Sequence, residues 1–340
     1  MIAGRPPRSP VARARSPPDR SSLRACRRVR LSVLHTPSVM DRLIFCCPRR
    51  VAGFCVDYRK LRILNDFNSS VIAEFRANQG RVGGMFEGGR LLLLTTTGAR
   101  SGRPHTVPLG YLPDQDRVLV IGSNGGAPRR PAWFHNLLAH PFAEVEDGPF
   151  VYEAAATVLS GKERDDAFGR AVEQDPGWSD YERQSGRVLP VVALQAVPEA
   201  GPPRSGPGGP SSPAAVLRLV HGAFRRELEL IRAEVVASGA VLGAQLRVNC
   251  LTLCANLHGH HVKEDQGLFP MLEYAHPELA PAVAVLRAEH GTVAALLGRL
   301  RSVLGDPGLS RADLLAAVDE LTGELIAHLD HEEAVVDGIL

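Results

Sequence analysis

Histidines and acidic residues recur at helical spacing in the last third of this 340-residue chain. His260 and Glu264 form one His-x3-Glu pair, and His328 and Glu332 form a second. The members of each pair are four residues apart, so on an α-helix both side chains lie on the same face, one turn apart. Imidazole and carboxylate groups are ligands of first-row transition metals such as iron. The doubled pair therefore indicates a metal site.

Four helices, bounded by Gly and Pro residues, are expected to carry these side chains. Two further histidines, His221 and His290, fall on the first and third helices. In an up-down-up-down bundle all four histidines then lie at one end, facing one another across the core. Four imidazoles and two carboxylates in that position suit two iron ions, with the carboxylates able to bridge. The expected helices cover residues 214–237, 243–274, 278–304 and 310–336.

This part of the chain resembles the haemerythrin-like HHE family over roughly residues 214–336, through segments 220–228, 260–270, 288–290 and 328–333. The resemblance implies a non-haem di-iron centre that binds dioxygen, nitric oxide or a similar small ligand, or senses redox state. Haemerythrins proper carry a second third-helix histidine where this chain has Ala294. One iron is therefore expected to keep an open or solvent-occupied position. His258, His261 and His331 are expected to lie behind the ligands or at the surface.

The composition is ordinary for a globular protein, with 44% hydrophobic and 22% charged residues. A length of 340 residues suggests two domains, each large enough to form its own core. The formal net charge of +2 is too small to indicate nucleic-acid binding by the folded domains. Six cysteines without a paired framework imply no disulfides and fit a reducing, cytoplasmic location. No apolar run reaches the roughly 18 residues of a membrane helix.

The remaining sequence divides into three segments. Residues 1–60 are rich in Arg, Pro and Ser with very few acids, which predicts a disordered basic tail or an over-long translation start. Residues 198–213 form a Pro/Gly linker. Between them, residues 64–197 contain several short strand patterns and few helices, which indicates an antiparallel barrel. The bundle is assigned to residues 214–340, so the fold class is α+β with two domains.

Two loops of the expected barrel could do chemistry. In residues 98–103, small residues leave backbone N–H groups accessible, while two guanidinium groups and a hydroxyl supply hydrogen-bond donors for a phosphate. In residues 123–126, two glycines allow a ligand to approach the backbone closely, and Trp133 offers a flat apolar surface nearby. Each feature alone also fits an ordinary exposed turn or a core tryptophan.

Together and in this order, the two loops and three further segments resemble the deazaflavin-dependent nitroreductase family over about residues 66–197. The resemblance implies a split β-barrel of the FMN-binding type that binds the deazaflavin coenzyme F-420. The reduced coenzyme would pass a hydride to quinone or nitro compounds. The matching segments are residues 91–104, 121–137, 161–165, 178–181 and 187–192.

By position, this resemblance assigns a role to each candidate coenzyme residue. The phosphate and acidic tail would be held by Arg100, Ser101 and Arg103, where Arg100 replaces a common lysine and keeps the charge with different hydrogen-bond geometry. Tyr181 would face the substrate and could donate a proton or hydrogen bond to the reduced product. The ring system and its linker would lie against Ser123, Asn124, Gly125, Gly126, Ala127 and Pro128, with Trp133 and Asn136 packing beside them.

Three functions compete at this point. The first is a deazaflavin-dependent reductase fused to a di-iron module that binds or senses oxygen, nitric oxide or peroxide. The second is a sensory or binding protein in which the barrel has no catalytic role. The third gives the barrel FMN or haem, because similar barrels hold those groups. A loop rich in Arg and Ser accepts any phosphate, so it fits FMN as well as the deazaflavin.

Overall fold

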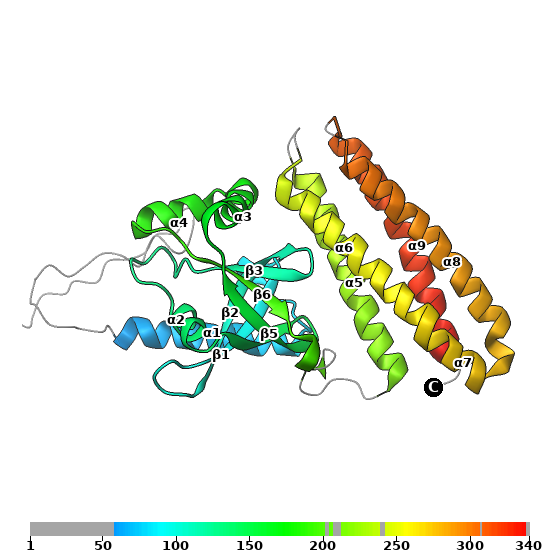
Figure 1. Cartoon of the computed structure of the whole chain (residues 1–340), viewed down its shortest axis with the longest axis horizontal. Coiled ribbons are helices and arrows are strands. Elements are labelled where there is room, and N and C mark those ends of the chain that lie inside the picture. The colour runs from blue at the N-terminus through cyan, green and yellow to red at the C-terminus, as the bar shows by residue number, and fades with distance from the viewer. Residues whose placement is uncertain (1–57, 201–203, 207–211, 239–241, 307, 338–340) are drawn as a thin grey trace, which may run out of the picture. The chain divides into compact units, whose positions relative to one another are not determined.

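The computed structural model describes residues 58–200, 204–206, 212–238, 242–306 and 308–337 (Figure 1). The expectation of a tail or over-long start at residues 1–60 therefore lies almost wholly outside the described residues. The first helix, α1 (Tyr58–Ala77), begins before residue 64, where the expected barrel domain starts. In these ranges, no helix combines the length with the apolar character that crossing a membrane requires.

Six antiparallel strands form a closed barrel in the first half. Their order is β4-β1-β2-β3-β6-β5, and β4 also pairs with β5, which closes the ring. Closure leaves none of the six as an open edge. A two-residue strand, β7 (Arg204–Ser205), adds to β5 from within the expected linker. The six strands are β1 (Leu91–Thr97), β2 (Pro104–Asp114), β3 (Arg117–Ile121), β4 (Phe142–Asp147), β5 (Phe150–Val158) and β6 (Val191–Ala196).

Buried apolar side chains fill the barrel and attach its helices. Leu92 and Leu94 of β1 are fully buried and share a core with Trp133 and Phe134 of α2 (Ala132–Ala139). A second cluster packs Phe168 of α3 (Gly161–Gln174) against β3 and β6. The β1 sequence is apolar at four consecutive positions because both of its faces are covered.

One helix beside the barrel was not expected from the sequence. It is α4 (Gly177–Ser185), which ends at Gly186 with a left-handed φ of 64°. Its nine residues contain only two large apolar side chains, Trp178 and Tyr181. That is too few to show a helical period.

Four long helical segments form the bundle in the second half, which Figure 1 shows running alternately up and down. The expected helix bounds agree with the structure within about two residues, except that the second helix is interrupted. There a π-helical turn, Glu264–Leu268, separates α6 (Ala244–Lys263) from α7 (Phe269–Ala275). The other three helices are α5 (Pro213–Ala237), α8 (Ala280–Leu304) and α9 (Arg311–Asp337).

Short polar side chains cap the N-termini of α5 and α9. The Ser212 hydroxyl accepts a hydrogen bond from the Ala215 N–H at 3.2 Å, and Ser310 forms the same kind of cap with Asp313. Such caps satisfy N–H groups that have no partner inside the helix. The closed strand ring and the four long helical segments confirm the two-domain α+β class, with a barrel and an all-α bundle.

The bundle core yields a stability prediction. Leu325 has no exposed surface, whereas its neighbour Ile326 is 37% exposed. Leu325→Ala should lower the free energy of unfolding of the bundle by about 2–5 kcal/mol, because it removes buried methyl groups and leaves a cavity. Ile326→Ala, the matched control, should cost less than about 1 kcal/mol. Urea unfolding followed by helical circular dichroism measures both, and equal losses would contradict this packing.

Candidate functional site

The six expected metal ligands come together inside one end of the bundle. His221 lies near the start of α5, and His260 lies near the end of α6. His290 is on α8, while His328 and Glu332 are on α9. Because successive helices run in opposite directions, early positions on α5 and α8 meet late positions on α6 and α9.

His221 and His260 lie against Glu264, which starts the π-helical turn. The Nε2 atom of His260 is 2.9 Å from Oε1 of Glu264, and Nε2 of His221 is 3.9 Å from the same oxygen. One ring nitrogen of each histidine and one oxygen of Glu264 lie within 4.8 Å of one another, as the ligands of a single ion would.

Two carboxylates lie between this group and a second group of histidines. The other Glu264 oxygen, Oε2, is 3.6 Å from Nε2 of His290. One oxygen of Glu332, Oε2, is 3.3 Å from Nε2 of His221 and 3.8 Å from Nε2 of His328. Each carboxylate thus faces both groups, which is the arrangement that bridging of two ions requires.

Carboxylates outside the centre orient three of the rings. Nδ1 of His221 is 2.9 Å from Glu333, and Arg225 in turn donates to the same carboxylate at 2.7 Å. Nδ1 of His290 is 3.0 Å from Asp265. Nδ1 of His328 is 2.9 Å from Glu289, which also bonds His331 at 2.8 Å. These bonds leave Nε2 of each ring directed inward, as in metal-bound histidines.

The centre collects buried polar atoms that lack a hydrogen bond. Glu332 has no exposed surface, and Glu264 is 4% exposed. Buried polar groups in folded proteins are almost always hydrogen-bonded, and each one left unpaired costs about 1–3 kcal/mol. Nε2 of His260 and Oε1 of Glu264 are 2.9 Å apart but do not have the geometry of a hydrogen bond. Within the described residues, the centre's atoms without a hydrogen bond are all four oxygens of Glu264 and Glu332 and the Nε2 atoms of His221, His260, His261, His290 and His328.

The two carboxylates shift the pKa values of their neighbours. Burial alone would lower the pKa of His221, but Glu264 and Glu332 outweigh it and raise that pKa to about 9. Burial opposes ionisation of Glu264, yet His221 and His260 lower its pKa to about 2. The carboxylates therefore attract positive charge to this point, as a cation site requires.

His261 does not take the surface alternative of the sequence expectation, because its ring is buried. Its exposed fraction is 5%, and burial together with His290 and His328 lowers its pKa to about 2. His258 is exposed, and His331 is half exposed with its Nδ1 bound to Glu289. His258 is therefore at the surface, and His331 lies behind the carboxylate that orients His328.

In the barrel, the loop between β1 and β2 exposes the two expected guanidinium groups. Arg100 and Arg103 are both exposed. The hydroxyl Oγ of Ser101 accepts a hydrogen bond from the Arg103 N–H at 3.3 Å and lies 3.3 Å from Nε2 of His105. A Cβ atom at Gly98 would lie 2.3 Å from Oγ of Ser101, so a larger residue there would displace this hydroxyl. The turn holds one hydroxyl and two cationic groups at the surface.

The loop after β3 is tightly wound. Asn124, Gly125 and Gly126 have positive φ angles of 54°, 60° and 73°. The Gly126 N–H donates to the Ser123 carbonyl at 3.2 Å. A Cβ atom at Gly126 would lie 2.6 Å from Oε1 of Gln184 on α4. The φ angle favours glycine there, and a side chain would also displace the end of Gln184. Ala127 is half-buried and Pro128 exposed in the same loop.

Helix α2 connects this loop to the first one. Asn136 is buried, donates to Oγ1 of Thr96 at 3.0 Å and accepts from the Ala99 N–H at 3.0 Å. It therefore holds the backbone next to Arg100. Trp133 is only 6% exposed and belongs to the barrel core.

Tyr181 lies on α4 beside the second loop. Its ring is half-buried and meets Trp178 edge-on, with 6.1 Å between ring centroids. A Cβ atom at Gly126 would lie 3.3 Å from its Cδ1 atom. Tyr181 is thus next to the loop that the sequence assigned to the ring system of a coenzyme.

Arg187 begins one of the matching segments, but the sequence analysis gave it no role. Its Nη2 donates to the carbonyl groups of Gly122 at 3.0 Å, Ser123 at 2.9 Å and Arg129 at 3.3 Å. Burial and the nearby Arg130 lower the pKa of this guanidinium. Its Nη1 is buried without a hydrogen bond. An arginine just before a strand carries no sequence signal for such a role, because the bonded carbonyls are distant in sequence.

Comparison with known proteins gives matches for both halves. A family model described as F420H(2)-dependent quinone reductase matches residues 69–196, and one described as hemerythrin HHE cation binding domain matches residues 212–337. An F420H(2)-dependent quinone reductase of Mycobacterium tuberculosis is 36% identical over 126 residues, covering 36% of this chain and 85% of that protein. A putative F420H(2)-dependent quinone reductase of the same organism is 29% identical over 104 residues, covering 31% and 87%. A solved structure of an F420-H2 dependent reductase is 34% identical, covers 31% of this chain and 94% of that chain, and has a TM-score of 0.29.

Arg187 yields a prediction about the second loop. Arg187→Ala should speed hydrogen exchange of the Gly126 and Ala127 amides by at least 10-fold, because the carbonyl groups that hold the loop lose their shared donor. Arg183→Ala is the matched control, since Arg183 is exposed and pairs only locally with Asp180. Exchange followed by mass spectrometry measures the effect. Unchanged protection in Arg187→Ala would contradict the holding role.

Proposed function

Because the chain belongs to the F420H(2)-dependent quinone reductase family and carries a hemerythrin HHE cation binding domain, we propose that it combines a reductase with a metal-binding module. The barrel binds reduced coenzyme F-420, which supplies a hydride for the reduction of quinone or nitro compounds. The bundle binds two iron ions and through them a small ligand such as dioxygen or nitric oxide. The working units are residues 64–197 and 214–340, joined by residues 198–213, in a cytoplasmic protein.

The exposed turn of the barrel supports an anionic coenzyme. Guanidinium groups of Arg100 and Arg103, with the hydroxyl of Ser101, are the donors that phosphate and carboxylate groups bind most strongly. Asn136 fixes the backbone next to Arg100, so part of the binding geometry exists before the coenzyme arrives. A preformed site loses less conformational freedom on binding.

The second loop supports a planar ring beside a substrate residue. Asn124, Gly125 and Gly126 have left-handed backbone angles, and the two glycines carry no side chain, so a planar ring can approach the loop backbone closely. Arg187 holds the loop from the other side. Tyr181 stands next to Gly126, where its hydroxyl can hydrogen-bond a substrate carbonyl or nitro oxygen. In this reaction the protein orients the two reactants, and the coenzyme carries the difficult chemistry.

The observation that carries the metal assignment is the group of unpaired buried atoms. Five imidazole nitrogens and four carboxylate oxygens meet in an apolar bundle without hydrogen bonds. A cation is the partner that satisfies all of them, and imidazole with carboxylate suits iron. His221 and His260 would hold one ion, His290 and His328 the other, and Glu264 and Glu332 would contact both.

The coenzyme assignment is tested by titrating the full chain with oxidised F-420 and, in parallel, FMN, following ligand fluorescence. We expect tight F-420 binding that weakens more than 10-fold in an Arg100→Ala, Ser101→Ala double variant. Each hydrogen bond to a charged group contributes about 1.5–3 kcal/mol. Lys162→Ala, at a highly exposed site on α3, is the control and should bind normally. Binding of FMN alone would overturn the assignment, as would binding of neither ligand.

The metal assignment is tested by counting iron after anaerobic loading and gel filtration. The wild-type chain should carry two ions. Glu332→Ala should carry fewer than one, because its carboxylate lies against both groups of histidines. Glu333→Gln is the matched control: it keeps an oxygen acceptor for Nδ1 of His221 and should load both ions with about 10–100-fold lower affinity. Two ions in Glu332→Ala would refute the shared site.

A further inference from the structure

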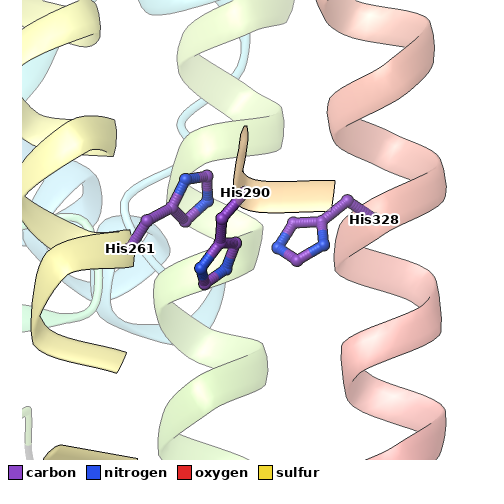
Figure 2. A group of neighbouring side chains, drawn as sticks. All are labelled: His261, His290 and His328. Atoms are coloured by element: carbon purple, nitrogen blue, oxygen red, sulfur yellow. The ribbon is translucent and has the colours of Figure 1, made fainter. Parts of the chain in front are cut away.

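His261 is a fifth imidazole in the metal centre, beyond the four that the paired motifs indicate. It follows His260 on α6, so it points about 100° further around the helix. Figure 2 shows its ring beside those of His290 on α8 and His328 on α9. One ring nitrogen from each of these three buried residues lies within 4.8 Å of the other two.

The surroundings of His261 do not explain it as an ordinary core histidine. Its Nε2 is buried and has no hydrogen bond. No carboxylate oxygen of the described residues lies within 4.0 Å of its ring nitrogens, whereas His290 and His328 are each bonded to a carboxylate through Nδ1. An imidazole buried without a partner for Nε2 is costly unless that atom binds something else.

The third helix supplies no second histidine to this group, so a further ligand would come from another helix. Ala294, one turn after His290, is exposed and has no side-chain atom that could bind a metal ion. The helix therefore supplies one histidine to the second group. His261 reaches the same group from α6, on the side that faces His290.

Resting on the proposed two-ion function, we propose that His261 is the third histidine ligand of the second metal ion, together with His290 and His328. The rings of His261 and His290 are stacked, with 4.1 Å between centroids and 12° between planes. Two parallel stacked rings cannot aim their in-plane lone pairs at one ion. His261 therefore turns on metal binding, because His290 is held by Asp265.

This ligand set makes the two ions unequal. The second ion has three imidazoles, and the first has two, from His221 and His260. Both share the carboxylates of Glu264 and Glu332. The first ion then has more positions open to a small ligand than the second. Without His261 as a ligand, the lack of a histidine at Ala294 would leave the ion beside His290 no better supplied than the first.

The test uses the full chain, stripped of metal and titrated with Co²⁺ against a chelator. His261→Phe keeps a flat ring on His290 without a nitrogen, and His261→Ala removes the ring. Both variants should bind the first ion as the wild type does, and the second ion more than 100-fold more weakly. This loss is larger than the roughly 10–100-fold loss of affinity expected when only a hydrogen-bond partner of a ligand is removed. His258→Ala, exposed on the same helix, is the control and should bind both ions normally.

A second measurement needs no variant and so does not depend on variant folding. In the proton NMR spectrum of the wild-type di-cobalt chain, each bound imidazole gives one strongly shifted, exchangeable N–H signal. Five signals are expected, and four would overturn the proposal. Equal binding of two ions by His261→Phe and wild type would also overturn it. A wild-type chain that binds no metal would instead refute the two-ion function itself.

Discussion

The bundle depends on a cluster of charged and polar groups that its own atoms do not satisfy. Glu264 and Glu332 are buried between imidazoles, and none of their oxygens makes a hydrogen bond. Removing such groups from water is costly, and the surrounding leucines and valines offer nothing in return. In the proposed function a bound cation offsets this cost, which would couple metal binding to the folding of this end of the bundle. The outer carboxylates Asp265, Glu289 and Glu333 fix the rings in the orientation that the ion needs.

In the barrel the candidate binding groups are exposed. Their two loops are therefore held in one conformation by contacts with the rest of the barrel and not by burial. The closed strand ring supplies a rigid base, Asn136 fixes the first loop, and Arg187 binds the carbonyl groups of the second. The candidate coenzyme site is thus organised by backbone contacts, whereas the candidate metal centre is organised by buried side chains.

Much of this arrangement is predictable from local sequence patterns. The helices of the bundle, the β1 run of four leucines and the turn after it follow from period, composition and Gly or Pro positions. The missed features lack a local signal. The π-helical turn at Glu264 depends on packing around the centre, and helix α4 has too few apolar residues to show a period. Burial of His261 follows from rotation by one residue past His260, which a His-x3-Glu motif does not encode.

Anomalous diffraction at the iron edge, from crystals of the iron-loaded full chain, tests the metal centre most directly. The structure predicts two peaks per chain inside the bundle, one beside His221 and His260 and one beside His290 and His328. Both peaks should lie next to Glu264 and Glu332. A single peak, or iron bound only elsewhere, would contradict the two-ion centre and leave the unpaired buried carboxylates without a physical explanation.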